Sequence, residues 1–300
     1  MREKKMAAKL KTSVSSRFFM AGRDRVRSFP EVIELIAKCG FDGVDFDFEE
    51  VALRGEGWEK EMYETANAAA KYGVAIDFGH LPFHKVLNEK GEEDPELFEA
   101  VMRRAIDVAA FLGASKGVIH PTGKPNPYTE EFIKKAFERN LKFLSPFVEY
   151  GEKKGVKLAV ENMRSPKERE GLHRFGSLAS ELMMIVDALG VETCWDFGHA
   201  HCTSLKMQSE EIETLGKTLT VLHVNDNHSA GEDEHLLPFF GTVDWKDAMA
   251  GLGKVGYTGY FNYECRMVRL PQNDKLRENI GVYAHTLAET LIGMTDADVK

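Results

Sequence analysis

Eight short apolar segments, each followed by a polar loop and a stretch of helical periodicity, constrain the fold of this 300-residue chain most strongly. Some of them, such as Ala159–Glu161, lack polar alternation, which is typical of parallel strands covered on both faces. No linker separates the units, and eight strand–helix units in about 250–300 residues predict one (β/α)8 TIM barrel domain spanning residues 1–300. The expected strands are Lys11–Ser15, Gly43–Phe48, Val74–Phe78, Gly117–His120, Lys157–Glu161, Thr193–Phe197, Val221–Asn225 and Tyr260–Glu264.

The helices expected between these strands carry recognisable end signals. Val32–Cys39 is preceded by Ser28 and Pro30 and followed by Gly40, which is the usual order of an N-cap, a first-turn proline and a C-terminal glycine. The other expected helices are Glu59–Tyr72, Glu96–Leu112, Thr129–Lys154, Ser177–Leu189, Ser209–Leu215, Trp245–Leu252 and Leu276–Ile292.

Composition narrows the class of protein. The 39 Lys and Arg against 48 Asp and Glu give a net charge of −9, which disfavours binding to nucleic acid or to anionic lipid. No run approaches the roughly 18 apolar residues of a membrane helix, and the basic N-terminus is not followed by an apolar signal core. The four cysteines have no CxxC spacing. We therefore expect a soluble, reduced, cytoplasmic protein.

Groups that bind metal ions lie at the ends of the last four expected strands. Glu161, Asp196, His223 and Glu264 would meet at one mouth of a barrel, where TIM barrels place their chemistry. Buried carboxylates that converge in this way are costly unless a cation compensates them. Oxygen and imidazole donors suit Mn²⁺, Mg²⁺, Co²⁺ or Zn²⁺, so the four residues predict one divalent metal ion.

Further polar residues follow the same strand ends or the loops beyond them. They are expected to bind substrate, and all of them except Arg266 could instead bind additional metal ions. These residues are His80, His120, His199, Asp233, His235 and Arg266.

Five motifs carry a resemblance to a known family. The chain resembles the sugar isomerase/epimerase superfamily of xylose isomerase-like TIM barrels, which also contains endonuclease IV. The similarity begins near Gly40–Phe46 and extends to the eighth expected strand. The motifs are VENM (Val160–Met163), WDFGHAH (Trp195–His201), LHVNDN (Leu222–Asn227), DEHLLPFFGTVDW (Asp233–Trp245) and NYECR (Asn262–Arg266).

The resemblance implies a metal-ligand set. In ketose 3-epimerases one divalent ion is held by a Glu, an Asp, a His and a Glu, which match Glu161, Asp196, His223 and Glu264. The family histidine that contacts substrate matches His199. Endonuclease IV binds three zinc ions with additional ligands, so further metal ions stay open for this chain. The additional matching positions are His80, His120, Asp233 and His235.

Two departures from the family pattern affect specificity. The usual Pro-Gly-x-Gly is replaced by Pro-Phe-Phe-Gly at 238–241, which predicts a bulkier loop. The Asp-Ser-Lys and Arg-His stretches of endonuclease IV are also absent, which weakens the similarity to the DNA-repair enzyme.

The sequence favours a metal-dependent isomerase or epimerase that acts on a small sugar or polyol ketone. Glu161 and Glu264 are expected to transfer a proton at the carbon next to the carbonyl, while His199 and Arg266 orient oxygen atoms. Three alternatives stay open: a metal-dependent dehydratase or lyase, an endonuclease IV-like phosphodiesterase, and a sugar-binding subunit without catalysis. The sequence is also compatible with a homo-oligomer.

Overall fold

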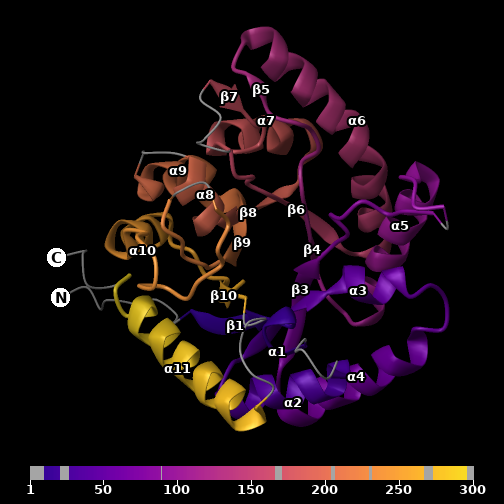
Figure 1. The fold of residues 1–300 in the computed structure, drawn as a ribbon, viewed down its shortest axis with the longest axis vertical. Coiled ribbons are helices and arrows are strands. Elements are labelled where there is room, and N and C mark those ends of the chain that lie inside the picture. Colours follow the sequence, from indigo (N-terminus) through magenta and orange to yellow (C-terminus); the bar gives the residue numbers. More distant parts are fainter. Residues whose placement is uncertain are drawn as a thin grey trace, which may run out of the picture.

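Eight parallel strands form one sheet that curves into a nearly closed barrel, which confirms the expected TIM barrel (Figure 1). The computed structural model describes residues 10–20, 27–88, 90–165, 171–203, 207–229, 232–266 and 273–295. β10 pairs with β1, and a bridge between Val224 and Tyr263 brings the end of β9 to β10. The strands are β1 (Lys11–Ser15), β2 (Gly43–Asp47), β3 (Ala75–His80), β4 (Lys116–Ile119), β6 (Lys157–Glu161), β8 (Glu192–Asp196), β9 (Leu219–His223) and β10 (Tyr260–Tyr263).

Helices surround the barrel and begin and end close to the positions expected from their caps. At the start of α2, the Ser28 amide donates to the Glu31 carboxylate at 2.9 Å, and Gly40 ends the helix with a φ of 95°. No helix in the described part of the chain is long and apolar enough to cross a bilayer. The surrounding helices are α2 (Phe29–Cys39), α4 (Glu59–Tyr72), α5 (Pro95–Phe111), α6 (Glu130–Lys154), α7 (Ala179–Leu189), α9 (Gln208–Leu215), α10 (Trp245–Val255) and α11 (Asp274–Ile292), with a 3₁₀ turn at Gly216–Thr218.

Short elements that the sequence did not predict lie in the loops that follow the barrel strands. Three are helices: α1 (Arg17–Met20), α3 (Phe48–Leu53) and α8 (Phe197–Thr203). The other two, β5 (Asn126–Pro127) and β7 (Leu172–His173), pair antiparallel and join the loop after β4 to the loop after β6. These elements build the walls of the barrel mouth.

A buried carboxylate organises the bulky loop after β9. Asp226 accepts hydrogen bonds from the Phe239 amide (2.9 Å), the Val243 amide (3.0 Å) and the Trp245 indole (2.9 Å). A Cβ at Gly241 would lie 2.3 Å from Asp226 Oδ1, so this position requires glycine. Phe239 occupies the position where the family has its first glycine, and it adopts a left-handed φ of 69°.

Replacing Phe239 by glycine is expected to stabilise the protein. Its side chain is 59% exposed, so little packing is lost, and glycine relieves a backbone cost of about 1–2 kcal/mol. We expect Phe239→Gly to raise the free energy of unfolding by up to about 1 kcal/mol, measured by chemical denaturation.

The neighbouring phenylalanine provides a matched control. Phe240 is 58% exposed but has no positive φ, so Phe240→Gly should lower the free energy of unfolding by about 0.5–1 kcal/mol. Equal destabilisation by the two variants would contradict this account of the loop.

Candidate active site

The polar residues of the barrel mouth stand directly above an apolar layer of the barrel. Five strands contribute a buried apolar residue to this layer: Phe78, Val118, Ala159, Cys194 and Val221. Side chains two positions apart point to the same face of a strand, so the next residues also face the barrel interior. These next residues, in the same order, are His80, His120, Glu161, Asp196 and His223.

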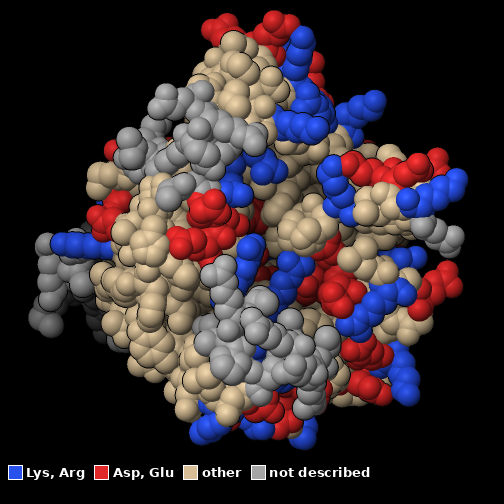
Figure 2. All heavy atoms as spheres, viewed as in Figure 1, with Lys and Arg blue, Asp and Glu red and all other residues tan. Residues whose placement is uncertain are grey.

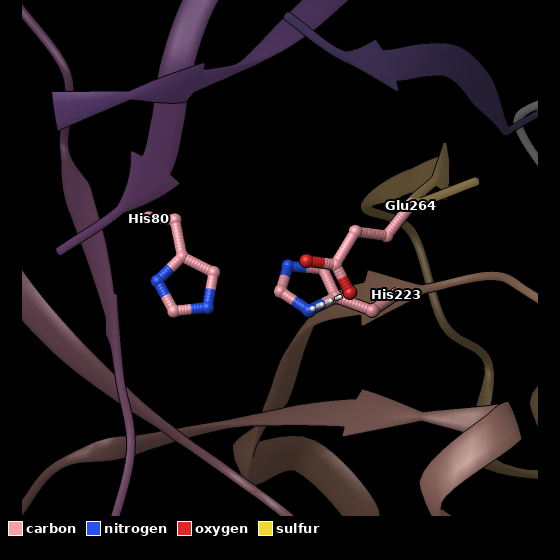
Figure 3. A group of neighbouring side chains, drawn as sticks. All are labelled: His80, His223 and Glu264. Atoms are coloured by element: carbon pink, nitrogen blue, oxygen red, sulfur yellow. Dashed lines mark ion pairs between the residues drawn. The ribbon is translucent and has the colours of Figure 1, made fainter. Parts of the chain in front are cut away.

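Four of the predicted residues form a compact buried group, the central quartet: Glu161, Asp196, His223 and Glu264. One ligand atom from each lies within 4.8 Å of all the others. His223 Nδ1 is 3.0 Å from Glu161 Oε1 and 3.4 Å from Glu264 Oε2. Figure 3 shows the His223 ring and the Glu264 carboxylate close together, with the His80 ring facing them.

Amide side chains hold Asp196 of the quartet in place. Its backbone amide donates to Asn162 Oδ1 at 2.6 Å, and Asn225 Nδ2 donates to its carboxylate at 2.7 Å. The next turn, at the start of α8, approaches so closely that a Cβ on Gly198 would lie 1.8 Å from Asn225 Oδ1. The Asp196 carboxylate also accepts from the His199 amide at 2.6 Å.

The charges of the quartet are poorly compensated by the protein alone. Burial raises the pKa of Asp196 to about 6, against the opposing effect of His199. Burial would also raise the pKa of Glu161, but His223 and His120 outweigh it and hold that pKa well below its usual range. Glu161 Oε1 and His223 Nδ1 lie 3.0 Å apart but are not aligned for a hydrogen bond, and neither they nor His223 Nε2 have another hydrogen-bond partner among the described residues.

These atoms fit a divalent cation. Three carboxylates and one imidazole form an oxygen-rich donor set of the kind that hard and borderline divalent ions prefer. Ligand atoms about 2.1 Å from one ion lie up to roughly 4.2 Å apart, so a spread of 4.8 Å needs only a small contraction. The nearby Cys194 thiol stays out of this set, because burial raises its pKa and keeps it protonated.

His80 and His120 extend the group from the neighbouring strands. His120 Nε2 lies 3.0 Å from Glu161 Oε2 and 3.1 Å from His80 Nε2. Burial lowers the pKa of His120 to about 4, so this ring is neutral at pH 7. The two histidines and Glu161 form a second set of donor atoms within 4.8 Å.

A third set of polar groups lies on the other side of the quartet. Asp233 Oδ2 is 2.8 Å from His235 Nε2, 3.8 Å from His199 Nε2 and 3.6 Å from Arg266 Nη2. Burial opposes the protonation of His199, but neighbouring carboxylates, above all Asp196, raise its pKa to about 10.

Three of the histidines share one orientation. The Nδ1 atoms of His80, His199 and His235 donate to the backbone carbonyls of Leu81 (2.8 Å), Asn162 (2.8 Å) and Glu264 (2.6 Å), respectively. Because a carbonyl can only accept, each Nδ1 carries its proton, and Nε2 is the nitrogen that faces other side chains of the site: His120 for His80, and Asp233 for His199 and His235.

All predicted substrate-binding residues line one cavity of about 80 Å³, which is large enough for several water molecules. Glu161 and Glu264 also line this cavity, whereas Asp196 and His223 are fully buried. The structure therefore brings every predicted site residue together at the barrel mouth.

The structure adds residues from the second strand and from the short helices α1 and α3, which the sequence argument did not consider. Asp45 Oδ2 lies 3.5 Å from His223 Nε2, on the side away from the quartet. Arg17 lines the cavity and pairs with Asp47 at 2.5 Å and with Glu49 at 3.1 Å. Asp45 and Asp47 could have been found from the sequence, because the segment Asp-Phe-Asp ends the second strand.

The chain belongs to the xylose isomerase-like TIM barrel family, whose model matches residues 33–285. An uncharacterised protein of Methanocaldococcus jannaschii, MJ1311, is 25% identical over 295 residues, which cover 96% of this chain and 95% of that protein. The uncharacterised protein y4fM of Sinorhizobium fredii is 29% identical over 175 residues, 56% of this chain and 53% of that protein.

Structural neighbours include sugar epimerases. A D-tagatose 3-epimerase-like protein superposes with a TM-score of 0.71 at 22% identity, covering 97% of this chain and all of that one. D-Psicose 3-epimerase superposes with a TM-score of 0.72 at 17% identity. The match covers 95% of this chain and all of the epimerase chain. The 3-keto-D-glucoside 4-epimerase YcjR of E. coli superposes with a TM-score of 0.63 at 15% identity. The match covers 93% of this chain and 99% of that one.

Proposed function

We propose that this protein is a divalent-metal-dependent isomerase or epimerase of a sugar or polyol ketone. The observation that carries the proposal is the central quartet, in which Glu161 Oε1 and both His223 ring nitrogens lack a hydrogen-bond partner among the described residues and whose composition suits a divalent ion. Membership of the xylose isomerase-like family and the sugar epimerases among the structural neighbours support the same conclusion.

Glu161, Asp196, His223 and Glu264 would hold the ion. When bound, the ion supplies a Lewis acid that polarises the substrate carbonyl. Glu161 and Glu264 reach the cavity from separate strands, so one carboxylate removes the proton next to the carbonyl and the other returns one. Return of the proton to the opposite face of the same carbon inverts its configuration, which is epimerisation. Return of the proton to the neighbouring carbon moves the carbonyl group, which is isomerisation.

The remaining cavity residues bind and orient the substrate. His199 and Arg266 donate hydrogen bonds to its oxygen atoms, and Asp233 and His235 bind hydroxyl groups. His80 and His120 shape the wall next to Phe83. A dehydratase on the same residues would start with the same proton removal and then expel a neighbouring hydroxyl group, so product analysis distinguishes the two reactions.

A second candidate is a phosphodiesterase similar to endonuclease IV. It is favoured by the second donor set, His80, His120 and Glu161, which adjoins the quartet. His80 and His235 would then exchange their present Nε2 contacts, with His120 and Asp233, for a metal ion. The net charge of −9 disfavours a polyanionic substrate. Metal stoichiometry separates the two candidates.

The first prediction from the proposed function is that one divalent ion co-purifies with the protein and stabilises it. A ligand that binds only the folded state adds about 2.7 kcal/mol at a hundredfold excess over its Kd. Elemental analysis should find the ion, and a chelator should lower the Tm in a way that added Mn²⁺ reverses. Protein without stoichiometric metal and without a chelator shift would contradict the site assignment.

The second prediction concerns the proton transfer. Glu264→Gln preserves the shape of the side chain but removes the base, so turnover of D-tagatose or D-psicose should fall by at least about a hundredfold. Glu152→Gln, at an exposed position on α6, is the matched control. Metal content is measured in both variants, and undiminished exchange of the substrate C–H in D₂O by a metal-loaded Glu264→Gln protein would place the base elsewhere.

The third prediction distinguishes one metal ion from several. If Asp233 and His235 bind substrate hydroxyls, the double variant Asp233→Asn, His235→Ala keeps its metal content and loses substrate affinity. If they hold a further ion, the variant loses one whole equivalent of metal. Elemental analysis of the double variant and of the parent protein distinguishes the two outcomes. If the variant loses one equivalent of metal and the parent cleaves an abasic-site duplex, the phosphodiesterase is favoured.

A further inference from the structure

A second, larger cavity adjoins the candidate active site. It has a volume of about 830 Å³ and shares two lining residues, Phe83 and His120, with the smaller cavity above the quartet. Phe98 and Phe143, with ring centroids 6.1 Å apart, form part of its apolar surface. A substrate that reacts at the quartet can therefore extend past His120 into this space.

Three basic side chains of this cavity have no acidic partner in the described part of the chain. Lys124, Arg139 and Arg174 line it, and among the described residues none of the three has a carboxylate oxygen within 4 Å of its charged group. Buried Arg174 Nε lacks any hydrogen-bond partner in the same part of the chain. We call the space the cationic cavity.

The acidic residues of the cationic cavity are already engaged. Glu93 pairs with Lys85. Asp94 caps the N-terminus of α5 by accepting a hydrogen bond from the Leu97 amide at 2.9 Å. His84, which also lines the cavity, binds Glu49 at 2.7 Å. With Glu93 paired, Lys124, Arg139 and Arg174 outnumber the one other carboxylate of the lining, Asp94, so the cavity carries an excess of positive charge.

The scaffold fixes the three cations relative to one another. Pairing of β5 with β7 joins the loop that carries Lys124 to the segment that ends at Arg174. Asn140 of α6 exchanges two hydrogen bonds with the backbone of Thr122, at 2.7 and 3.0 Å. A Cβ on Gly123 would lie 3.2 Å from Arg139 Nη1, so this guanidinium rests against the same loop.

Local charge here opposes the charge of the whole protein. The chain carries a net charge of −9, yet basic side chains lie around the hollow of the face in Figure 2, between the regions that Figure 1 labels β7, α6 and α5. A concave surface lined by one sign of charge concentrates the field and attracts ligands of the opposite sign. Arginine pairs suit the paired oxygens of phosphate and carboxylate groups.

We propose that the cationic cavity binds an anionic substituent, a phosphate or a carboxylate, of the sugar whose carbonyl end lies at Glu161 and Glu264. The inference rests on the proposed function for its second half, since it assigns the substrate class of that site. Arg139 and Arg174 bind the anionic oxygens, and Lys124 adds a third positive charge at the same loop.

Calorimetric titration tests this proposal on the purified protein, both as isolated and after chelator treatment. The probes are D-fructose, D-fructose 6-phosphate, D-glucuronate and inorganic phosphate. We expect at least about tenfold tighter binding of one anionic sugar than of D-fructose, as one charge-assisted contact would give. In the double variant Arg139→Gln, Arg174→Gln, the ratio of the two affinities should fall towards one.

Lys134→Gln is the matched control, because it removes one positive charge from α6 outside the cavity lining. It should retain the parental preference. Tighter binding of D-fructose 6-phosphate identifies phosphate as the substituent, and tighter binding of D-glucuronate identifies carboxylate. Equal affinity of the parent for all three sugars, or an equal loss of preference in Lys134→Gln, would overturn the proposal.

The design separates failure of this proposal from failure of the proposed function. Anion-dependent binding by the protein, together with no ketose conversion by its metal-loaded form, would support the cationic cavity and contradict the epimerase. Ketose turnover without a preference for anionic sugars would support the epimerase and contradict anion binding in the cationic cavity. An abasic-site duplex that competes for Arg139 and Arg174 would overturn the sugar proposal in favour of nucleic acid.

Discussion

The burial of several carboxylates around one imidazole is the constraint on which the rest of this site depends. Glu161, Asp196 and Glu264 converge on His223 within 4.8 Å, and an ionised carboxylate costs several kcal/mol to bury without compensation. Burial already raises the pKa of Asp196 to about 6. A bound divalent cation would relieve this cost, and the side chains of Asn162 and Asn225 hold Asp196 in place.

The barrel produces this arrangement by simple geometry. Residues two apart on a parallel strand face the same way, so the apolar layer that includes Ala159, Cys194 and Val221 is followed by a polar layer at the carboxyl ends. The apolar layer fills the barrel, and the polar layer stands above it at the mouth. The loop after β9 then adds Asp233 and His235 to this layer. The loops after β3, β4 and β6, together with α6, line the cationic cavity beside it.

Sequence reasoning reached the fold and the polar residues because both follow local rules. Caps such as Ser28 and Gly40 fix helix ends, and strand ends fix which residues reach the mouth. It missed β5 and β7 because two-residue strands have no periodicity and form only through a distant partner. It missed the cationic cavity for a similar reason, since Lys124, Arg139 and Arg174 come from three separate segments.

Anomalous X-ray scattering from crystals grown with Mn²⁺ tests the central claim most directly, because it locates an ion independently of any activity. The account predicts a strong peak bounded by Glu161, Asp196, His223 and Glu264, with bond lengths of about 2.0–2.2 Å. Crystals in which these side chains enclose no anomalous peak, or in which manganese lies only on surface carboxylates, would contradict it.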